Sequence, residues 1–155
     1  MASIYPIRAD LVVQAPDGNI VAMVEVKNAE GLSADVAARL RRNLMGYGRA
    51  DWWSPYFMVI SQETGYLWDQ RARRPDPVEL PTTEFPMGPV VARYLPSFVG
   101  DGRLSGSQVE LAVQQWLWDL AGDVEDRPHE PDAALAATGF LEFIRGGRVS
   151  TEIDL

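Results

Sequence analysis

The chain has no cysteine, one histidine and no long apolar run among its 155 residues. Without cysteine it has no disulfide bonds, no thiolate metal site and no cysteine nucleophile. No run has the length of a membrane span, and the charged first twenty residues do not form a signal peptide, so we expect a soluble cytoplasmic protein. The one histidine, His129, stands in an acidic, proline-rich stretch and is expected to be an inert surface residue.

Lysine is as rare as histidine. Thirteen of the fourteen basic residues are arginine, and the only lysine is Lys27. Arginine and lysine are not chemically interchangeable, because an ammonium is a compact point charge on a flexible stem. A single lysine can occur by chance in an arginine-rich chain, so its position decides whether a functional role is indicated.

The composition predicts one folded domain spanning residues 1–155. Hydrophobic residues make up 46% of the chain, enough for one core and too little for two. The 23% of charged residues excludes a disordered chain or a coiled coil.

The charge is unevenly distributed, and the net value of −8 argues against a simple nucleic-acid binder. Residues 1–74 hold nine basic and eight acidic residues, whereas residues 75–155 hold five and fourteen. The arginines of the first half form two clusters, which are either a solvated face or a track for phosphates: Arg39, Arg41, Arg42 and Arg49, then Arg71, Arg73 and Arg74.

A β-hairpin is expected near the start of the chain. Residues 9–14 and 20–27 are β-branched, apolar strands, and Asp17-Gly18 between them is a turn signal. A turn centred there, with a two- or four-residue loop, pairs positions whose numbers add to 35. Asp10 then lies opposite Glu25, and alternation puts Lys27 on the same face. A three-residue loop or a bulge would shift this register.

The remaining pattern alternates helices and strands and predicts an α/β fold with a central mixed sheet flanked by helices. We expect residues 1–70 to form a core, 75–100 a proline-rich connection without regular structure, and 105–155 a helical extension with a terminal strand. In the first half we expect a helix over 34–47 and strands over 56–61 and 66–69, with a turn at 63–65 between the strands. In the second half we expect a helix that begins at the capping box of Ser107 and Glu110 and ends at Ala121. A last helix is expected to be capped by Asp132 and closed by Gly146-Gly147. On the helix over 34–47, Asn43 and Tyr47 share a side with Val36 and Leu40, while Arg41 and Arg42 point elsewhere.

Two carboxylates and an ammonium on one face are suited to metal-dependent chemistry. Asp10 and Glu25 offer the hard oxygen ligands that Mg²⁺ or Mn²⁺ prefers, and the backbone carbonyl of Val26 offers another. A metal held there would activate water and stabilise charge on a phosphate, and Lys27 could orient that water or stabilise the developing anion. The alternative is a structural ion network of the same three side chains.

Residues 8–28, RADLVVQAPDGNIVAMVEVKN, resemble the PD-(D/E)XK, or restriction-endonuclease-like, nuclease superfamily, with the type I restriction and exonuclease branches nearest. Residues 55–69 are similar to the next strand pair of those proteins. The resemblance implies a restriction-endonuclease-like core, Asp10 and Glu25 as metal ligands, and Lys27 as the catalytic lysine. Asn43-x-x-x-Tyr47 is a looser match to a Gln-x-x-x-Tyr motif of those branches and implies substrate or positioning residues; a polar pair that satisfies backbone groups is the alternative.

The function expected from this resemblance is hydrolysis of phosphodiester bonds in nucleic acid, DNA rather than RNA, with Mg²⁺ or Mn²⁺. Arg39 and Arg42 are the candidate substrate-binding arginines, and a homodimer or a protein partner is possible for cutting both strands. The competing hypothesis is a nuclease fold without turnover that docks a partner within a larger complex. Two features of the sequence support it: the acidic second half, and the absence of the family's usual helix from the nine residues before Asp10. A third is Trp118, which cannot share a helical face with the core residue Trp116 and is a candidate contact residue.

Overall fold

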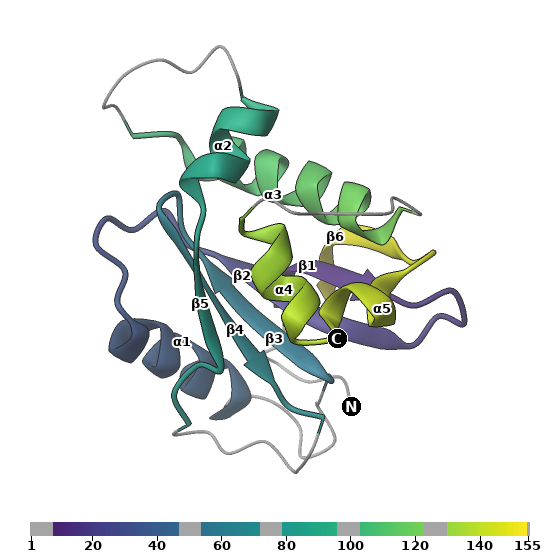
Figure 1. Ribbon diagram of the computed structural model, residues 1–155. Helices are drawn as coiled ribbons and strands as arrows, with labels where there is room; N and C mark the ends of the chain where they lie inside the picture. The colour runs from purple at the N-terminus through teal and green to yellow at the C-terminus, as the bar shows by residue number, and fades with distance from the viewer. Residues whose placement is uncertain (1–7, 47–53, 72–78, 96–102, 123–129, 155) are drawn as a thin grey trace.

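The computed structural model describes residues 8–46, 54–71, 79–95, 103–122 and 130–154 (Figure 1). The elements in chain order are β1 (Arg8–Gln14), β2 (Ile20–Val26), α1 (Ala34–Gly46), β3 (Tyr56–Ile60), β4 (Thr64–Asp69), β5 (Thr83–Pro86), α2 (Gly88–Tyr94), α3 (Gly106–Ala121), α4 (Asp132–Ala137), α5 (Phe140–Ile144) and β6 (Arg148–Asp154). The predicted α/β class is confirmed. Within these ranges no helix is long and apolar enough to cross a membrane.

One mixed sheet of six strands forms the centre, in the order β5-β4-β3-β2-β1-β6. Only β2 and β3 run parallel, and every other neighbouring pair is antiparallel. A parallel pair requires a crossover connection, and α1 lies within the one that joins β2 to β3. The last strand returns beside the first, so the predicted terminal strand belongs to the central sheet.

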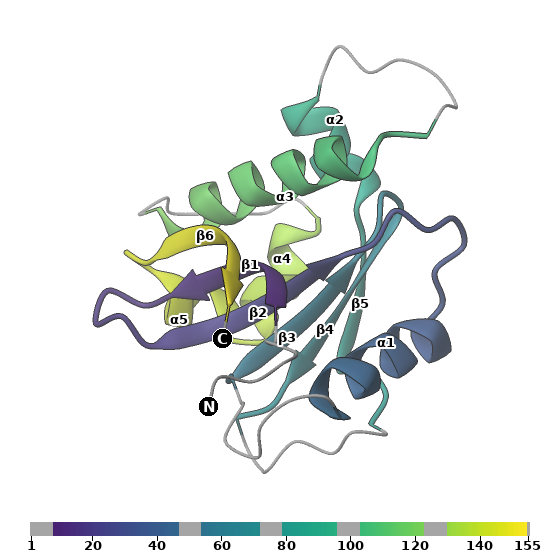
Figure 2. The ribbon, with the colours of Figure 1, turned by 180° about the vertical axis from the view of Figure 1, so that it is seen from behind.

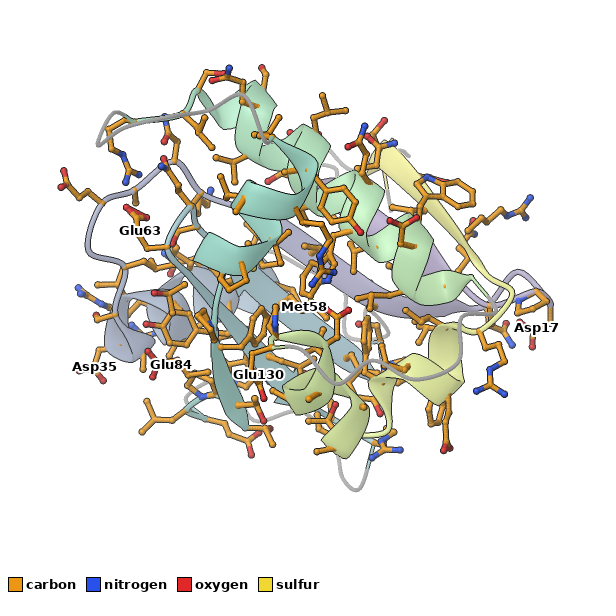
Figure 3. The ribbon with its side chains drawn as sticks, turned by 45° about the horizontal axis from the view of Figure 1, so that its top comes forward. Asp17, Asp35, Met58, Glu63, Glu84 and Glu130 are labelled. Carbon is orange, nitrogen blue, oxygen red and sulfur yellow. The ribbon has the colours of Figure 1, made fainter. Side chains whose placement is uncertain are left out.

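The helices cover the two faces of the sheet unequally. Ala37 and Ala38 of α1 pack with Met23 and Phe57 on one face. The other face carries α2, α3, α4 and α5, which pack on side chains such as Met58 at the centre of the sheet (Figures 1, 2 and 3). The C-terminal helices, expected from the sequence as an extension, therefore pack directly on the central sheet.

The hairpin has the predicted register over most of its length. Leu11 pairs with Val24, Val12 with Met23, and Val13 with Ala22, each pair adding to 35. The register shifts only between Val13 and Gln14, close to the turn. Figure 3 shows the turn residue Asp17 at one side of the molecule and Glu63, in the β3–β4 turn, at the other.

The proline-rich connection was predicted without regular structure, which was wrong for its middle part. It contains β5 and α2. Proline is compatible with both because β5 is an edge strand and a proline occupies the first turn of α2, where no intrahelical N–H bond is needed. The turn before β4 also lies earlier than predicted, since Thr64 and Gly65 belong to the strand.

Two helix boundaries differ from the prediction. The cap of α3 is Ser105, not Ser107, and its capping box is completed by Gln108. The last helix is two short helices, because Gly139 takes a left-handed conformation with φ 79° between them. Asp132 does not cap α4: its buried carboxylate accepts bonds from Trp116 Nε1 at 2.9 Å and from Arg93.

Candidate metal centre

Asp10, Glu25 and Lys27 lie together at the end of the hairpin opposite its turn. Continuing the pairing of Leu11 with Val24 by one residue sets Asp10 opposite Glu25. Lys27 comes one residue after β2, but its N–H still donates to the carbonyl of Ile60 at 2.8 Å, so the strand pairing reaches it. Alternation directs all three side chains toward the face that carries α1.

Asp10 is tied to the backbone of the neighbouring strand. Its Oδ2 accepts a hydrogen bond from the N–H of Val26 at 2.8 Å. The N–H and C=O of one strand residue point to the same side, so the Val26 carbonyl also faces the side on which Asp10 lies. The Val26 carbonyl, expected as a third oxygen ligand, therefore faces the strand of Asp10.

Glu25 and Lys27 form an ion pair that satisfies only one carboxylate oxygen. The Lys27 ammonium lies 2.8 Å from Oε1 of Glu25, and the two side chains are 37% and 9% exposed, respectively. The second oxygen, Oε2, is buried without a hydrogen-bond partner, and it is the only such side-chain atom among the described residues. Buried polar groups are nearly always paired, so this orphaned acceptor requires an explanation.

The surroundings of Glu25 disfavour its charge. Burial is the largest effect and raises the pKa of the Glu25 carboxyl above its usual 4.5, and the carboxylate of Asp10 raises it further. The hydrogen bond and charge of Lys27 lower it, without cancelling the rise. Lys27 therefore does not fully offset the burial of the Glu25 carboxylate and the charge of Asp10.

The donor set fits a small divalent cation. Two carboxylates and a backbone carbonyl are hard oxygen ligands, and a cation between them would satisfy the orphaned oxygen and relieve the repulsion between the acids. In the described part of the chain no group of three or more histidine or acidic side chains gathers at one point. Mg²⁺ is usually held by one or two protein carboxylates and keeps several waters, so a set of two carboxylates and one carbonyl is compatible with it.

The candidate substrate residues are less completely placed. Arg39, Arg42 and Asn43 are exposed on α1, which covers the sheet face shared by Asp10 and Glu25. The structure does not bring them into contact with the three site residues. Tyr47 lies outside the described residues, as does His129.

The second arginine cluster is partly committed to other contacts. Arg71 pairs with Asp69 at 2.8 Å and lies over the rings of Tyr56 and Phe143. Arg49, Arg73 and Arg74 lie outside the described residues.

Arg41 was predicted to point away from the apolar side of α1, which was wrong. It is fully buried, its Nε donates to Oε1 of Gln70 at 3.0 Å, and its guanidinium lies over the Trp68 ring. Gln70 in turn donates to the carbonyl of Ser54 at 2.8 Å. The sequence offered only Ala37 and Ala38 as a signal, since small residues at these positions leave room for a long side chain one turn later.

Comparison of the chain with protein-family models, with curated proteins and with solved structures finds no match. The functional assignment therefore depends on the geometry of the chain itself.

Proposed function

We propose that the protein is a Mg²⁺- or Mn²⁺-dependent nuclease that hydrolyses phosphodiester bonds of nucleic acid, with DNA as the expected substrate. The observation that carries the proposal is the buried, unpartnered Oε2 of Glu25 beside Asp10 and Lys27. The order of Asp-strand, hairpin, E-x-K strand, helix and strand pair along the chain supports it, because this is the order expected of a PD-(D/E)XK nuclease.

The residues divide the chemical tasks between them. Asp10, Glu25 and the Val26 carbonyl would hold the cation, which supplies an activated water and charge stabilisation at the phosphate. Lys27 is the cationic side chain that pairs with Glu25, and it is 37% exposed, so it can reach a phosphate at the surface. There its ammonium stabilises the negative charge that develops on the phosphoryl oxygens or orients the attacking water.

Arg39 and Arg42 are proposed to contact phosphates next to the cleaved bond. They lie three residues apart on the exposed side of α1 and therefore project in similar directions. A few such contacts provide sequence-independent affinity, which a net-acidic protein needs at its substrate face. Asn43, exposed on the same helix, is proposed as a neutral positioning residue.

Cleavage assays test the proposal directly. Purified protein should cut linear, circular or single-stranded DNA in Mn²⁺ or Mg²⁺, and both Glu25→Gln and Lys27→Ala should lose the activity. Glu142→Gln and Arg145→Met remove the same kinds of charge on the opposite face and should retain it. Cleavage that persists in Lys27→Ala would refute the assigned site.

A second candidate function, a partner-docking module without turnover, has its own observation. Leu111 and Trp118 are 46% and 45% exposed and lie seven residues apart on α3, so they share one face of the helix. Trp116, by contrast, is fully buried, as predicted. Large exposed apolar side chains on one face are typical of an interaction surface. A calorimetric Mn²⁺ titration separates the candidates, because a docking module should take up no metal.

A further inference from the structure

The ion pair of Lys27 and Glu25 engages only one oxygen of the carboxylate. The ammonium, at 2.8 Å, serves Oε1 alone, while Oε2 of the same carboxylate is buried without a partner. Asp10, the second acid, is bound to the Val26 N–H rather than to the ammonium. One monovalent cation thus faces two carboxylates, and one acceptor remains unsatisfied.

The Lys27 side chain is able to move away from Glu25. Its side chain is 37% exposed, whereas that of Glu25 is 9% exposed, so the ammonium lies at the solvent edge and the carboxylate beneath it. A lysine side chain is long and flexible, and its charged end can move into water while its stem stays on the protein. Glu25, on a central strand, has no comparable freedom.

We infer that Lys27 is an internal counter-cation that occupies the Glu25 carboxylate until a divalent cation displaces it into solvent. The inference rests on the proposed function, because it concerns the metal site of that function. Metal uptake and release of the ammonium are one coupled event, and Lys27 lowers the apparent affinity for metal. The ammonium becomes available to a substrate phosphate only after the site has been loaded, so the lysine cannot act in the metal-free protein.

The coupling predicts opposite effects for two substitutions of the same residue. Lys27→Met keeps the length of the stem and removes the competing charge, so Mn²⁺ should bind about tenfold more tightly than to the unchanged protein. Lys27→Arg keeps the charge and adds a planar fork that pairs with a carboxylate through two bonds, so Mn²⁺ should bind several-fold more weakly. Arg145→Met, which removes a positive charge on the opposite face, should leave the affinity unchanged.

Calorimetric titration of the full chain with Mn²⁺ measures these affinities without any cleavage assay. An affinity of Lys27→Met that equals or falls below that of the unchanged protein overturns the inference. A Mn²⁺ affinity of Lys27→Arg that equals or exceeds that of the unchanged protein also overturns the inference. This second variant keeps the test decisive if Lys27→Met does not fold.

Urea unfolding provides a second readout. In a chelator, Lys27→Met should unfold at a lower urea concentration than the unchanged protein, because Glu25 has lost its counter-charge. In saturating Mn²⁺ the difference should disappear or reverse. An equal loss of stability in both conditions would show that Lys27 is only a structural partner and would overturn the inference.

Failure of this inference can be distinguished from failure of the proposed function. If the unchanged protein takes up no Mn²⁺, or if Glu25→Gln takes it up equally well, both are overturned. If uptake occurs and depends on Glu25 but is insensitive to Lys27, the metal site stands and only the coupling is overturned.

Discussion

The carboxylate of Asp10 is bonded to the backbone N–H of Val26 at 2.8 Å, across the two strands of the first hairpin. This hydrogen bond holds the Asp10 side chain of β1 against Val26, the residue that follows Glu25 in β2. It places the two acids side by side, close enough for Asp10 to raise the pKa of the Glu25 carboxyl.

Substitution of Asp10 should separate its structural role from its role in metal binding. Asp10→Ala leaves the part-buried Val26 N–H without its acceptor and should lower the free energy of unfolding by about 1 kcal/mol. Asp10→Asn keeps an oxygen that can accept this bond, so its stability should lie above that of Asp10→Ala. Both variants relieve the repulsion from Glu25 equally, and both should lose Mn²⁺ affinity. Equal stability of the two variants in urea unfolding would contradict the role of the bond.

The stability of the metal-free protein should depend on the protonation of Glu25. The pKa of Glu25 is raised in the folded protein, chiefly by burial, so the folded state holds its proton more firmly than the unfolded chain does. The resulting stabilisation is complete below the unfolded value and is lost as the pH rises through the folded pKa. Glu25→Gln, which stays neutral, should therefore be more stable than the unchanged protein at neutral pH and lose that advantage in acid.

The comparison requires urea unfolding in a chelator from about pH 4 to about pH 8, a range that covers ordinary and raised glutamate pKa values. Glu142→Gln, which replaces an exposed glutamate on α5, is the control for removal of a carboxylate outside the site. A stability difference between Glu25→Gln and the unchanged protein that is constant across the range would argue against a raised pKa.

The first hairpin shows how far sequence reasoning reaches. Its register followed from the Asp17-Gly18 turn and from alternation, and the bulge at Gln14 falls on the turn side of the pairs that position the site. Asp10 and Glu25 could thus be placed opposite each other from local rules. The orphaned Oε2 of Glu25 could not be predicted, because burial of one carboxylate oxygen depends on packing by distant elements.

Arg41 and α2 show where the same reasoning failed. A charged residue is assumed to face water unless a partner is known, and Gln70 and Trp68 lie far from Arg41 in sequence. Prolines were interpreted as breakers, although the first turn of a helix and an edge strand both accept them. In each case a tertiary contact or a position within an element overrode a residue's usual tendency.

The buried Arg41 should make Gln70 important for stability. Gln70→Leu removes the amide oxygen that accepts from the guanidinium, and loss of a hydrogen bond to a buried charged group costs about 2 kcal/mol. Arg42→Met, next to Arg41 but exposed, is the control and should not shift the urea midpoint. A midpoint for Gln70→Leu that equals that of the unchanged protein would show that the contact is not stabilising.

The sheet should be similarly sensitive at Gly65 of β4, the strand next to the edge strand β5. A methyl group added there would overlap the ring of Phe85, which lies directly over the glycine. Gly65→Ala must therefore displace a buried aromatic ring and should cost about 1–3 kcal/mol. Gly88→Ala, where an added methyl group meets no atom within 4 Å, is the control and should not destabilise the protein. The prediction fails if thermal unfolding gives the two variants the same midpoint.

Arg39 and Arg42 should contribute to nucleic-acid affinity through phosphate contacts. Replacing both with glutamine should weaken binding of a DNA duplex in Ca²⁺ and reduce the slope of log affinity against log salt by about 2, one unit for each lost contact. The same replacement of Arg145 and Arg148, which are exposed elsewhere in the chain, should leave the slope unchanged. Equal slopes for both double variants would place the substrate away from α1.

Anomalous diffraction from crystals soaked in Mn²⁺ tests the central claim most directly. We expect one peak between the carboxylates of Asp10 and Glu25, at about 2.0–2.5 Å from an oxygen of each, which is the distance at which such ions bind carboxylates. Oε2 of Glu25 should then be a ligand and the Lys27 ammonium should have moved away from Glu25. Absence of a peak there, or an ion bound elsewhere with Lys27 still paired to Glu25, would contradict the account.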